Sequence, residues 1–187
     1  FLTALRYSSF QTASIISTSG FATADFNLWP QFSRVILVIL MFIGACAGST
    51  GGGMKVSRVI LLCKMVFRQI RQTFQPRKVK VVRLEGKPVD EDMLSQIATF
   101  FFAYVLLILF ATLLVSLDNK FDLEANFTAA LSCVSNIGPG LGAVGPMGSF
   151  AGYSNFSKFV LSLAMLAGRL ELFPIFVLFH PAVWKKQ

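Results

Sequence analysis

The sequence predicts an all-α membrane protein, and three observations carry this prediction. Hydrophobic residues make up 55% of the 187 residues and charged residues only 14%, whereas soluble domains usually carry about 25% charged residues. The run from Met93 to Leu117 has no charged residue and is long enough to cross a bilayer. A third observation is a pattern that occurs twice: a short helix, a glycine-containing loop, an exposed turn and a long apolar helix.

The net charge of +8 is unevenly distributed along the chain. Ten basic residues fall between Lys55 and Lys87, and the apolar blocks on either side are nearly uncharged. Such a distribution is typical of a cytoplasmic loop under the positive-inside rule. It argues against nucleic-acid binding, because few aromatic residues are interleaved with the basic ones. The basic stretch could contact anionic lipid or a regulatory subunit.

The first elements are short. Residues 1–16 are moderately apolar but interspersed with hydroxyl side chains, which favours a short re-entrant helix over a full span. Residues 17–23 are small and polar and have no helix-forming character. Residues 25–30 predict an exposed turn in which Trp29 lies at the membrane interface.

An apolar segment follows at residues 31–54, and its second half should not form a helix. Residues 44–53 contain five glycines, each costing roughly 1 kcal/mol relative to alanine inside a helix. Unwound backbone at membrane depth is tolerated only where protein or a watery cavity surrounds it. We therefore expect an unwound loop, although Gly44, Gly48 and Gly52 also form a GxxxGxxxG series that is typical of close helix packing.

The remaining elements complete the second copy of the pattern. Residues 55–74 predict a helix that emerges into the cytoplasm, and residues 77–92 a polar connection. After the span at Met93 to Leu117 come a short helix at residues 121–134 and a small-residue loop at 135–142. Residues 159–184 are the last apolar run, with Arg169 in its middle.

The two small-residue loops match the design of a cation filter. Each follows a short helix and has a hydroxyl or amide residue two positions before a glycine, Gly20 or Gly138. Glycine permits the backbone to curl so that its carbonyl groups point together and replace an ion's hydration shell. Gly20 lies 28 positions before Gly48, and Gly138 lies 30 positions before Gly168. We therefore expect Arg169 and the glycine-rich break at a similar depth.

Four ordered motifs make a family resemblance specific. They are STSGFATADFNLWP, GACAGSTGGGMK, SNIGPGLGAVGP and GRLELFP. With them the chain resembles the Trk/Ktr/HKT potassium transporter superfamily, and most of all its bacterial TrkH-type pore subunit. That resemblance implies repeated units of outer helix, pore helix, filter loop and inner helix, related to potassium channels. It also implies K⁺ uptake across the bacterial cytoplasmic membrane by a multi-pass protein that needs no covalent cofactor and is not an enzyme.

The resemblance also assigns the repeats and the site residues. Residues 1–75 match a third repeat without its outer helix, residues 76–92 a cytoplasmic connection, and residues 93–187 a complete fourth repeat. The implied K⁺ filter residues are Thr18, Ser19, Gly20, Asn136, Ile137 and Gly138. The implied gate residues are Gly44, Gly48, Ser49, Thr50, Gly51, Gly52, Gly53 and Arg169.

Partners follow from the same resemblance. A conducting pore needs two further repeats from an N-terminal half or another chain, and the family implies a homodimer gated by a cytoplasmic nucleotide-binding RCK-type subunit. Contact with membrane lipid is expected throughout. Two other functions stay open on the sequence: a proton- or Na⁺-coupled K⁺ symporter, and a membrane scaffold whose glycines serve only helix packing.

Overall fold

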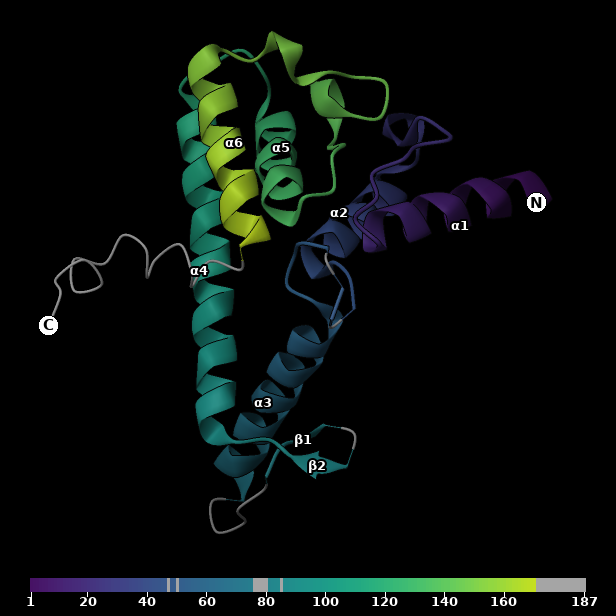
Figure 1. Cartoon of the computed structure of the whole chain (residues 1–187). Coiled ribbons are helices and arrows are strands. Elements are labelled where there is room, and N and C mark those ends of the chain that lie inside the picture. Colours follow the sequence, from purple (N-terminus) through teal and green to yellow (C-terminus); the bar gives the residue numbers. More distant parts are fainter. Residues whose placement is uncertain (47, 50, 76–80, 85, 171–187) are drawn as a thin grey trace, which may run out of the picture.

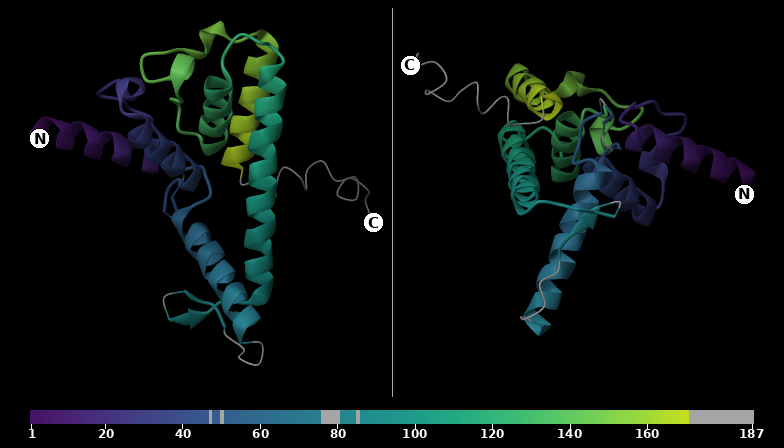
Figure 2. Two further views of the ribbon diagram at one scale, coloured as in Figure 1. Left: turned by 180° about the vertical axis from the view of Figure 1, so that it is seen from behind. Right: turned by 60° about the horizontal axis from the view of Figure 1, so that its bottom comes forward.

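The computed structural model describes residues 1–46, 48–49, 51–75, 81–84 and 86–170. The sequence-based predictions for Thr50, for residues 76–80 and 85, and for residues 171–187 lie outside this part of the chain. Helices dominate what is described. In Figure 1 three helices, α4, α5 and α6, lie side by side, α3 runs beside the lower part of α4, and α1 and α2 extend to one side. Figure 2 shows the same arrangement from two further directions.

The N-terminal elements agree with the short helix and turn that the sequence predicts. Helix α1 spans Leu2–Ile16, and the single turn η1 spans Phe26–Leu28. The Asp25 side chain caps this turn by accepting a hydrogen bond from the Asn27 N–H at 3.0 Å. The turn is not fully exposed as expected, because Phe26 is buried in the main core beside Leu37.

The long apolar segment is broken as predicted. Helix α2 (Gln31–Ile43) ends where Gly44 adopts a φ of 73°, and helix α3 (Val56–Phe74) begins after the glycine-rich stretch. Two backbone hydrogen bonds close the base of the intervening loop, from the Met54 N–H to the Phe42 carbonyl and from the Val56 N–H to the Ala45 carbonyl. The GxxxGxxxG helix-packing interpretation is therefore wrong, since Gly44, Gly48 and Gly52 do not lie in a helix.

The polar connection contains a small hairpin that the sequence did not predict. Strand β1 (Arg83–Leu84) pairs antiparallel with strand β2 (Lys87–Pro88). Val82, just before β1, is buried with Leu61 of α3 and with Leu94 and Ile97 of α4. This small core holds the hairpin against the first half of α3 and the start of α4. Alternating apolar residues over so few positions give too weak a period to predict strands.

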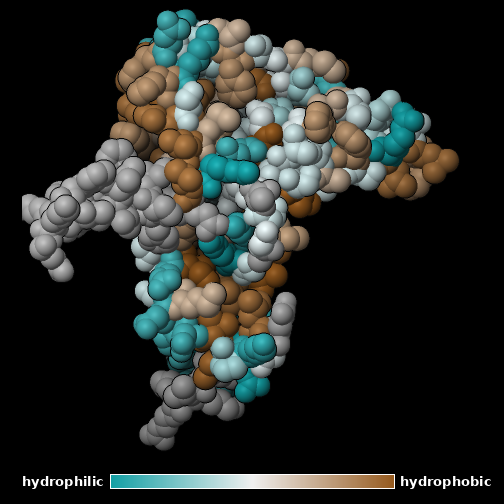
Figure 3. All heavy atoms as spheres, in the orientation of Figure 1, coloured by the Kyte–Doolittle hydropathy of each residue, from teal (hydrophilic) through white to brown (hydrophobic). Residues whose placement is uncertain are grey.

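Helix α4 (Glu91–Ser116) is, among the described residues, the one helix long and apolar enough to cross a membrane by length and composition. The predicted span is helical and begins two residues earlier than expected, with Glu91 and Asp92 in its first turn. Acidic side chains in the first turn stabilise a helix by interacting with the positive end of its dipole. One stripe of large apolar side chains stays exposed, at Phe102, Leu106, Leu109 and Leu113. Figure 3 shows apolar surface over this part of the molecule, as a lipid-facing helix requires.

Helix α5 (Leu123–Ser135) is the centre of the structure. Ten of its 13 residues are buried, and it packs against both α4 and α6. Two short turns follow, η2 (Gly142–Val144) and η3 (Phe150–Gly152), and then α6 (Asn155–Arg169). The start of α6 lies before the expected residue 159, because the Ser154 hydroxyl caps the helix by accepting from the Ser157 N–H at 3.1 Å.

Candidate functional site

The two predicted filter loops leave their helices in the same way. After α1 the Ser19 N–H donates to the Ser14 carbonyl at 3.0 Å, and after α5 the Ile137 N–H donates to the Ser132 carbonyl at 3.0 Å. In both cases the donor lies five residues after the acceptor, which is the hydrogen bond of a Schellman motif. Two helix ends that share serines at equivalent positions, Ser14 with Ser132 and Ser17 with Ser135, thus deliver their loops with one geometry.

The same equivalence holds for the backbone angles. Thr18 and Asn136 have φ values of 55° and 54°, in the left-handed region that few non-glycine residues adopt. Two positions later Gly20 and Gly138 again have positive φ, 74° and 117°. This sequence of angles curls each loop, so that consecutive carbonyl groups do not alternate in direction as they would in a strand.

The two loops lie against each other. A methyl group added to Gly20 would stand 2.0 Å from the carbonyl oxygen of Ile137, far closer than Cβ atoms approach any backbone atom. A methyl group on Gly138 would lie 4.0 Å from the Cα of Gly20. Glycine is thus required at position 20 both by its φ and by the neighbouring loop. The structure brings together residues that are far apart in the sequence, as the sequence analysis predicts.

The loop carbonyl groups have no internal donor. Within the described ranges, no N–H or O–H group donates to the main-chain oxygens of Thr18, Ser19, Gly20, Asn136, Ile137 or Gly138. Among these residues only Ile137 is buried, and backbone carbonyls without a protein donor pair with water or a ligand. No group of three His, Cys, Asp or Glu side chains that could hold a metal occurs among the described residues. Backbone carbonyl oxygens can replace part of a cation's hydration shell.

Hydroxyl groups of α5 hold the second loop in place, and sequence reasoning missed them. Thr128 Oγ1 accepts from the Leu141 N–H at 2.9 Å, and Ser132 Oγ accepts from the Gly138 N–H at 3.0 Å. Ser135 Oγ pairs with the Tyr104 hydroxyl at 2.7 Å, inside the core. The signal was present, because Thr128, Ser132 and Ser135 stand at i, i+4 and i+7 and so share one helix face.

Asn27 connects the two halves of the described chain and was also missed. Its side-chain nitrogen donates to the Gly142 carbonyl at 3.1 Å, and its side-chain oxygen accepts from the Gly142 N–H at 3.0 Å. Next to this pair, a methyl group on Gly145 would stand 2.0 Å from the Asn27 amide nitrogen. The Asn27 amide therefore occupies space that only glycine leaves open at position 145. Its two hydrogen bonds hold the segment that follows the second predicted filter loop.

The glycine-rich loop packs directly against the two predicted filter loops. A methyl group on Gly51 would stand 2.5 Å from Thr18 Oγ1, and one on Gly52 would stand 2.3 Å from the Ser135 carbonyl oxygen. These are close approaches to the ends of α1 and α5. Any larger residue at either position would push the loop away from the filter residues.

Arg169 meets the glycine-rich loop, as the spacing predicts. A cavity of about 250 Å³ is lined by Ser49, Gly51, Gly52, Gly53, Lys55, Phe100, Gly168 and Arg169. Gly168 lets α6 approach α5, since a methyl group there would stand 1.8 Å from the Val134 carbonyl oxygen. Of the other predicted gate residues, Gly44 turns the chain out of α2, and Gly48 lines a second cavity of about 490 Å³ with Lys55 and Arg58.

Asp118 follows the C-terminal end of α4, outside the spanning segment, and its carboxylate accepts two hydrogen bonds. Asp118 Oδ2 accepts from the Ser154 N–H at 3.1 Å and from the Ser157 hydroxyl at 2.6 Å. These hydrogen bonds from Ser154 and Ser157 lower the pKa of Asp118 below its ordinary value. The carboxylate thereby ties the turn after α4 to the start of α6, behind the second filter loop.

Comparisons with known proteins agree with this geometry. The family of TrkH cation transport proteins matches residues 3–186. The chain is 38% identical over 185 residues to the Trk system potassium uptake protein TrkH of Salmonella typhimurium, covering 99% of this chain and 38% of that protein. For TrkH of Halomonas elongata the identity is 37% over 185 residues, with the same coverage. The crystal structure of the potassium transporter TrkH from Vibrio parahaemolyticus superposes with a TM-score of 0.85 at 38% identity, covering 94% of this chain and 37% of that one.

Proposed function

The chain belongs to the TrkH family of cation transport proteins, and we propose that it forms part of a K⁺ uptake pore in the bacterial cytoplasmic membrane. Its relatives are named as transport proteins and not as enzymes. The chain spans about 38% of their length, so the complete pore requires more than the residues described. The observation that carries the proposal is the pair of equivalent loops that meet at Gly20 and Ile137. The carbonyl oxygens of residues 18–20 and 136–138 accept no hydrogen bond from the described residues.

In the proposed mechanism the carbonyl oxygens of residues 18–20 and 136–138 replace the water molecules that surround K⁺. The α1 and α5 helices point their C-terminal ends at the loops, and the negative end of a helix dipole favours a cation. The Schellman hydrogen bonds and the hydroxyls of Thr128 and Ser132 support the proposal, because they hold the loops in place without using the carbonyl groups that face the ion.

The proposed gate is the glycine-rich loop together with Arg169. Its supports are the close approach of Gly51 and Gly52 to the filter loops and the cavity that Arg169 shares with them. A guanidinium at this level repels a cation that leaves the filter. Movement of the loop away from the filter, with Arg169 following, would open the path, and loops without helical hydrogen bonds move at low cost.

Partners complete the proposed pore. Two loops that touch surround an ion on one side only. We therefore propose that an N-terminal half supplies two further repeats. Residues 1–75 and 93–187 are then the third and fourth repeats. The family resemblance adds a homodimer and a nucleotide-binding RCK-type subunit on the cytoplasmic side. The basic residues of α3 and of the connection support this orientation, because cytoplasmic segments are enriched in Lys and Arg.

The filter is tested by ⁸⁶Rb⁺ uptake into liposomes that contain the complete protein, with and without competing Na⁺. Gly138→Ser should lower uptake roughly tenfold and weaken discrimination against Na⁺, since a left-handed non-glycine residue costs about 1–2 kcal/mol. Gly20→Ser should lower uptake further, because its side chain would also meet the Ile137 carbonyl oxygen. The matched control is Gly86→Ser, because Gly86 also has a positive φ of 81° but has open space around it. Uptake equal to wild type in both filter variants would favour the scaffold function.

The gate and the coupling are tested in the same liposomes. Arg169→Ala should raise uptake in the absence of the regulatory subunit, whereas Lys158→Ala, a charge loss near the other end of α6, should not. If Arg169→Ala leaves uptake unchanged with and without the regulator, the gating role is wrong. A reversal potential that follows the K⁺ gradient alone supports a channel-like pore, and one that also follows the proton or Na⁺ gradient supports a symporter.

A further inference from the structure

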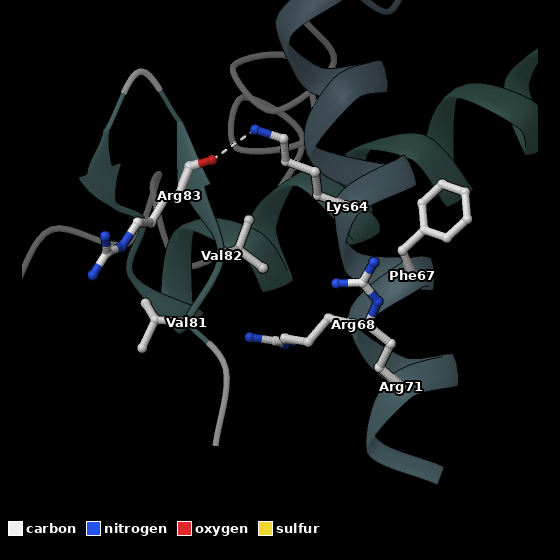
Figure 4. A pocket seen from close by; sticks show the side chains of 7 residues that line it. All are labelled: Lys64, Phe67, Arg68, Arg71, Val81, Val82 and Arg83. Carbon is white, nitrogen blue, oxygen red and sulfur yellow. Dashed lines mark hydrogen bonds between the residues drawn. The ribbon is translucent and has the colours of Figure 1, made fainter. Parts of the chain in front are cut away.

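A basic groove lies between α3 and the β1–β2 hairpin, away from the proposed ion path. We define it by Lys64, Arg68 and Arg71 of α3 with Val81, Val82 and Arg83, which together line a cavity of about 360 Å³. Phe67 is its remaining lining residue. Figure 4 shows the long side chains of Lys64, Arg68 and Arg71 leaving α3 beside the strand that carries Arg83. None of these described lining residues is acidic.

The groove carries more positive charge than its surroundings neutralise. Arg68 forms an ion pair with Glu91, and Lys64 Nζ donates to the Arg83 carbonyl oxygen at 2.8 Å. In the described part of the chain, Arg71 has no ion-pair partner. Arg83 faces α3 with its backbone carbonyl, and its guanidinium points away from α3 (Figure 4). Lys64, Arg68 and Arg71 are also neighbours on one helix face, where like charges destabilise each other. An anion bound in the groove would relieve this repulsion.

The groove lies where a membrane surface would be. Arg68 is paired with Glu91, the first residue of the candidate span α4. Helix α3 also exposes a stripe of large apolar side chains beside its basic face, at Ile60, Phe67, Ile70 and Phe74. An exposed apolar stripe next to cationic side chains is typical of a helix at the lipid interface. A soluble anion would use the charges but would leave this stripe in water.

We propose that the basic groove binds the phosphate group of an anionic phospholipid of the cytoplasmic leaflet, with the acyl chains along the exposed stripe of α3. Arg71 contributes charge, Lys64 and Arg68 shape the site, and Val82 and Phe67 contact the lipid backbone. This site is independent of the filter and gate. It places a lipid against α3, the helix that follows the glycine-rich loop.

The test uses the complete protein in nanodiscs of phosphatidylcholine that contain a low fraction of fluorescent phosphatidylglycerol. The variant is Arg71→Gln, which spares the Lys64 and Arg68 contacts. The control is Arg6→Gln, which removes the same charge from an exposed position outside the groove. Because one surface cation contributes about fivefold to binding of anionic lipid, the groove variant should bind phosphatidylglycerol roughly fivefold more weakly, and the control should bind it like wild type. Thermal unfolding in detergent verifies that both variants are folded.

Three results would overturn the proposal. Equal phosphatidylglycerol binding by the groove variant and the control would mean that the lipid responds to total charge. Displacement of the fluorescent lipid by millimolar inorganic phosphate would identify a soluble anion as the ligand. Lipid binding that is unchanged in the groove variant, while binding of the regulatory subunit is lost, would identify the groove as a protein-docking surface.

Discussion

Removal of the Asn27 side chain should loosen the contact between the two loop regions without disturbing any helix. Asn27→Ala deletes both hydrogen bonds to the Gly142 backbone, at 3.1 and 3.0 Å. Each neutral hydrogen bond contributes about 0.5–1.5 kcal/mol to stability, so the loss should be about 1–3 kcal/mol. Because Asn27 is half-buried and Gly142 is exposed, water can replace part of what is lost, and we expect the lower half of that range.

The consequence for transport is a change in selectivity. The Gly142 segment follows the second filter loop, and Asn27 follows the first, so the amide holds the two at a fixed separation. We expect Na⁺ to inhibit ⁸⁶Rb⁺ uptake more strongly in Asn27→Ala than in the wild type. The urea concentration at the midpoint of unfolding in detergent should also fall. Asn27→Asp is the sharper variant, since it keeps the acceptor for the Gly142 N–H but places a carboxylate against the Gly142 carbonyl. It should be at least as damaging as Asn27→Ala.

The control is Asn155→Ala, at an exposed position in the first turn of α6. It removes the same amide from the surface and should change neither the midpoint nor the selectivity. If Asn27→Ala behaves like this control in both measurements, then the two hydrogen bonds do not hold the loop regions together, and the reasoning is wrong.

Three further predictions follow from the same contacts. Gly168→Ala places a methyl group 1.8 Å from the Val134 carbonyl oxygen and should cost about 1–3 kcal/mol by separating α6 from α5; an unchanged urea midpoint would contradict this. Tyr104→Phe leaves the buried Ser135 hydroxyl without its partner at 2.7 Å and should cost about 1–3 kcal/mol, partly recovered in the double variant with Ser135→Ala; no recovery would contradict it. The pKa of Asp118 is lower when folded than when unfolded, so its stabilisation is complete above about pH 4 and is lost as the pH falls through the lowered pKa. Asp118→Asn should flatten that part of the pH dependence of the urea midpoint, and an unchanged slope would contradict the assignment.

The helices and their breaks were predictable because their signals are local. The uncharged run from Met93 to Leu117 is long enough to span a bilayer whatever its neighbours are, and it became α4. The five glycines of residues 44–53 cannot sustain a helix in any surrounding, and α2 ends at Ile43. The β1–β2 hairpin was missed because two residues per strand carry no periodic pattern. Buried Phe26 was missed because a turn residue is buried only by what packs over it.

The site was predictable in its residue types but not in its contacts. Small residues and glycines marked both loops, and spacing brought Arg169 to the level of the glycine-rich stretch, which agrees with the cavity that they share. Their roles in a filter and a gate stay predictions. Asn27 and the α5 hydroxyls carried weaker signals, since a lone asparagine in a turn normally caps its own backbone.

The sequence by itself determined which segments of this protein form its helices, which of the described helices is long and apolar enough to cross a membrane, and where the backbone must unwind. Chain length, charge and glycine content act on neighbouring residues and need no partner from elsewhere. Only the tertiary structure decided that Gly20 faces Ile137, that Asn27 binds Gly142 from 115 positions away, and that Gly52 lies against Ser135. These contacts depend on how packed helices bring distant backbone atoms within hydrogen-bonding distance, and no local pattern encodes that distance.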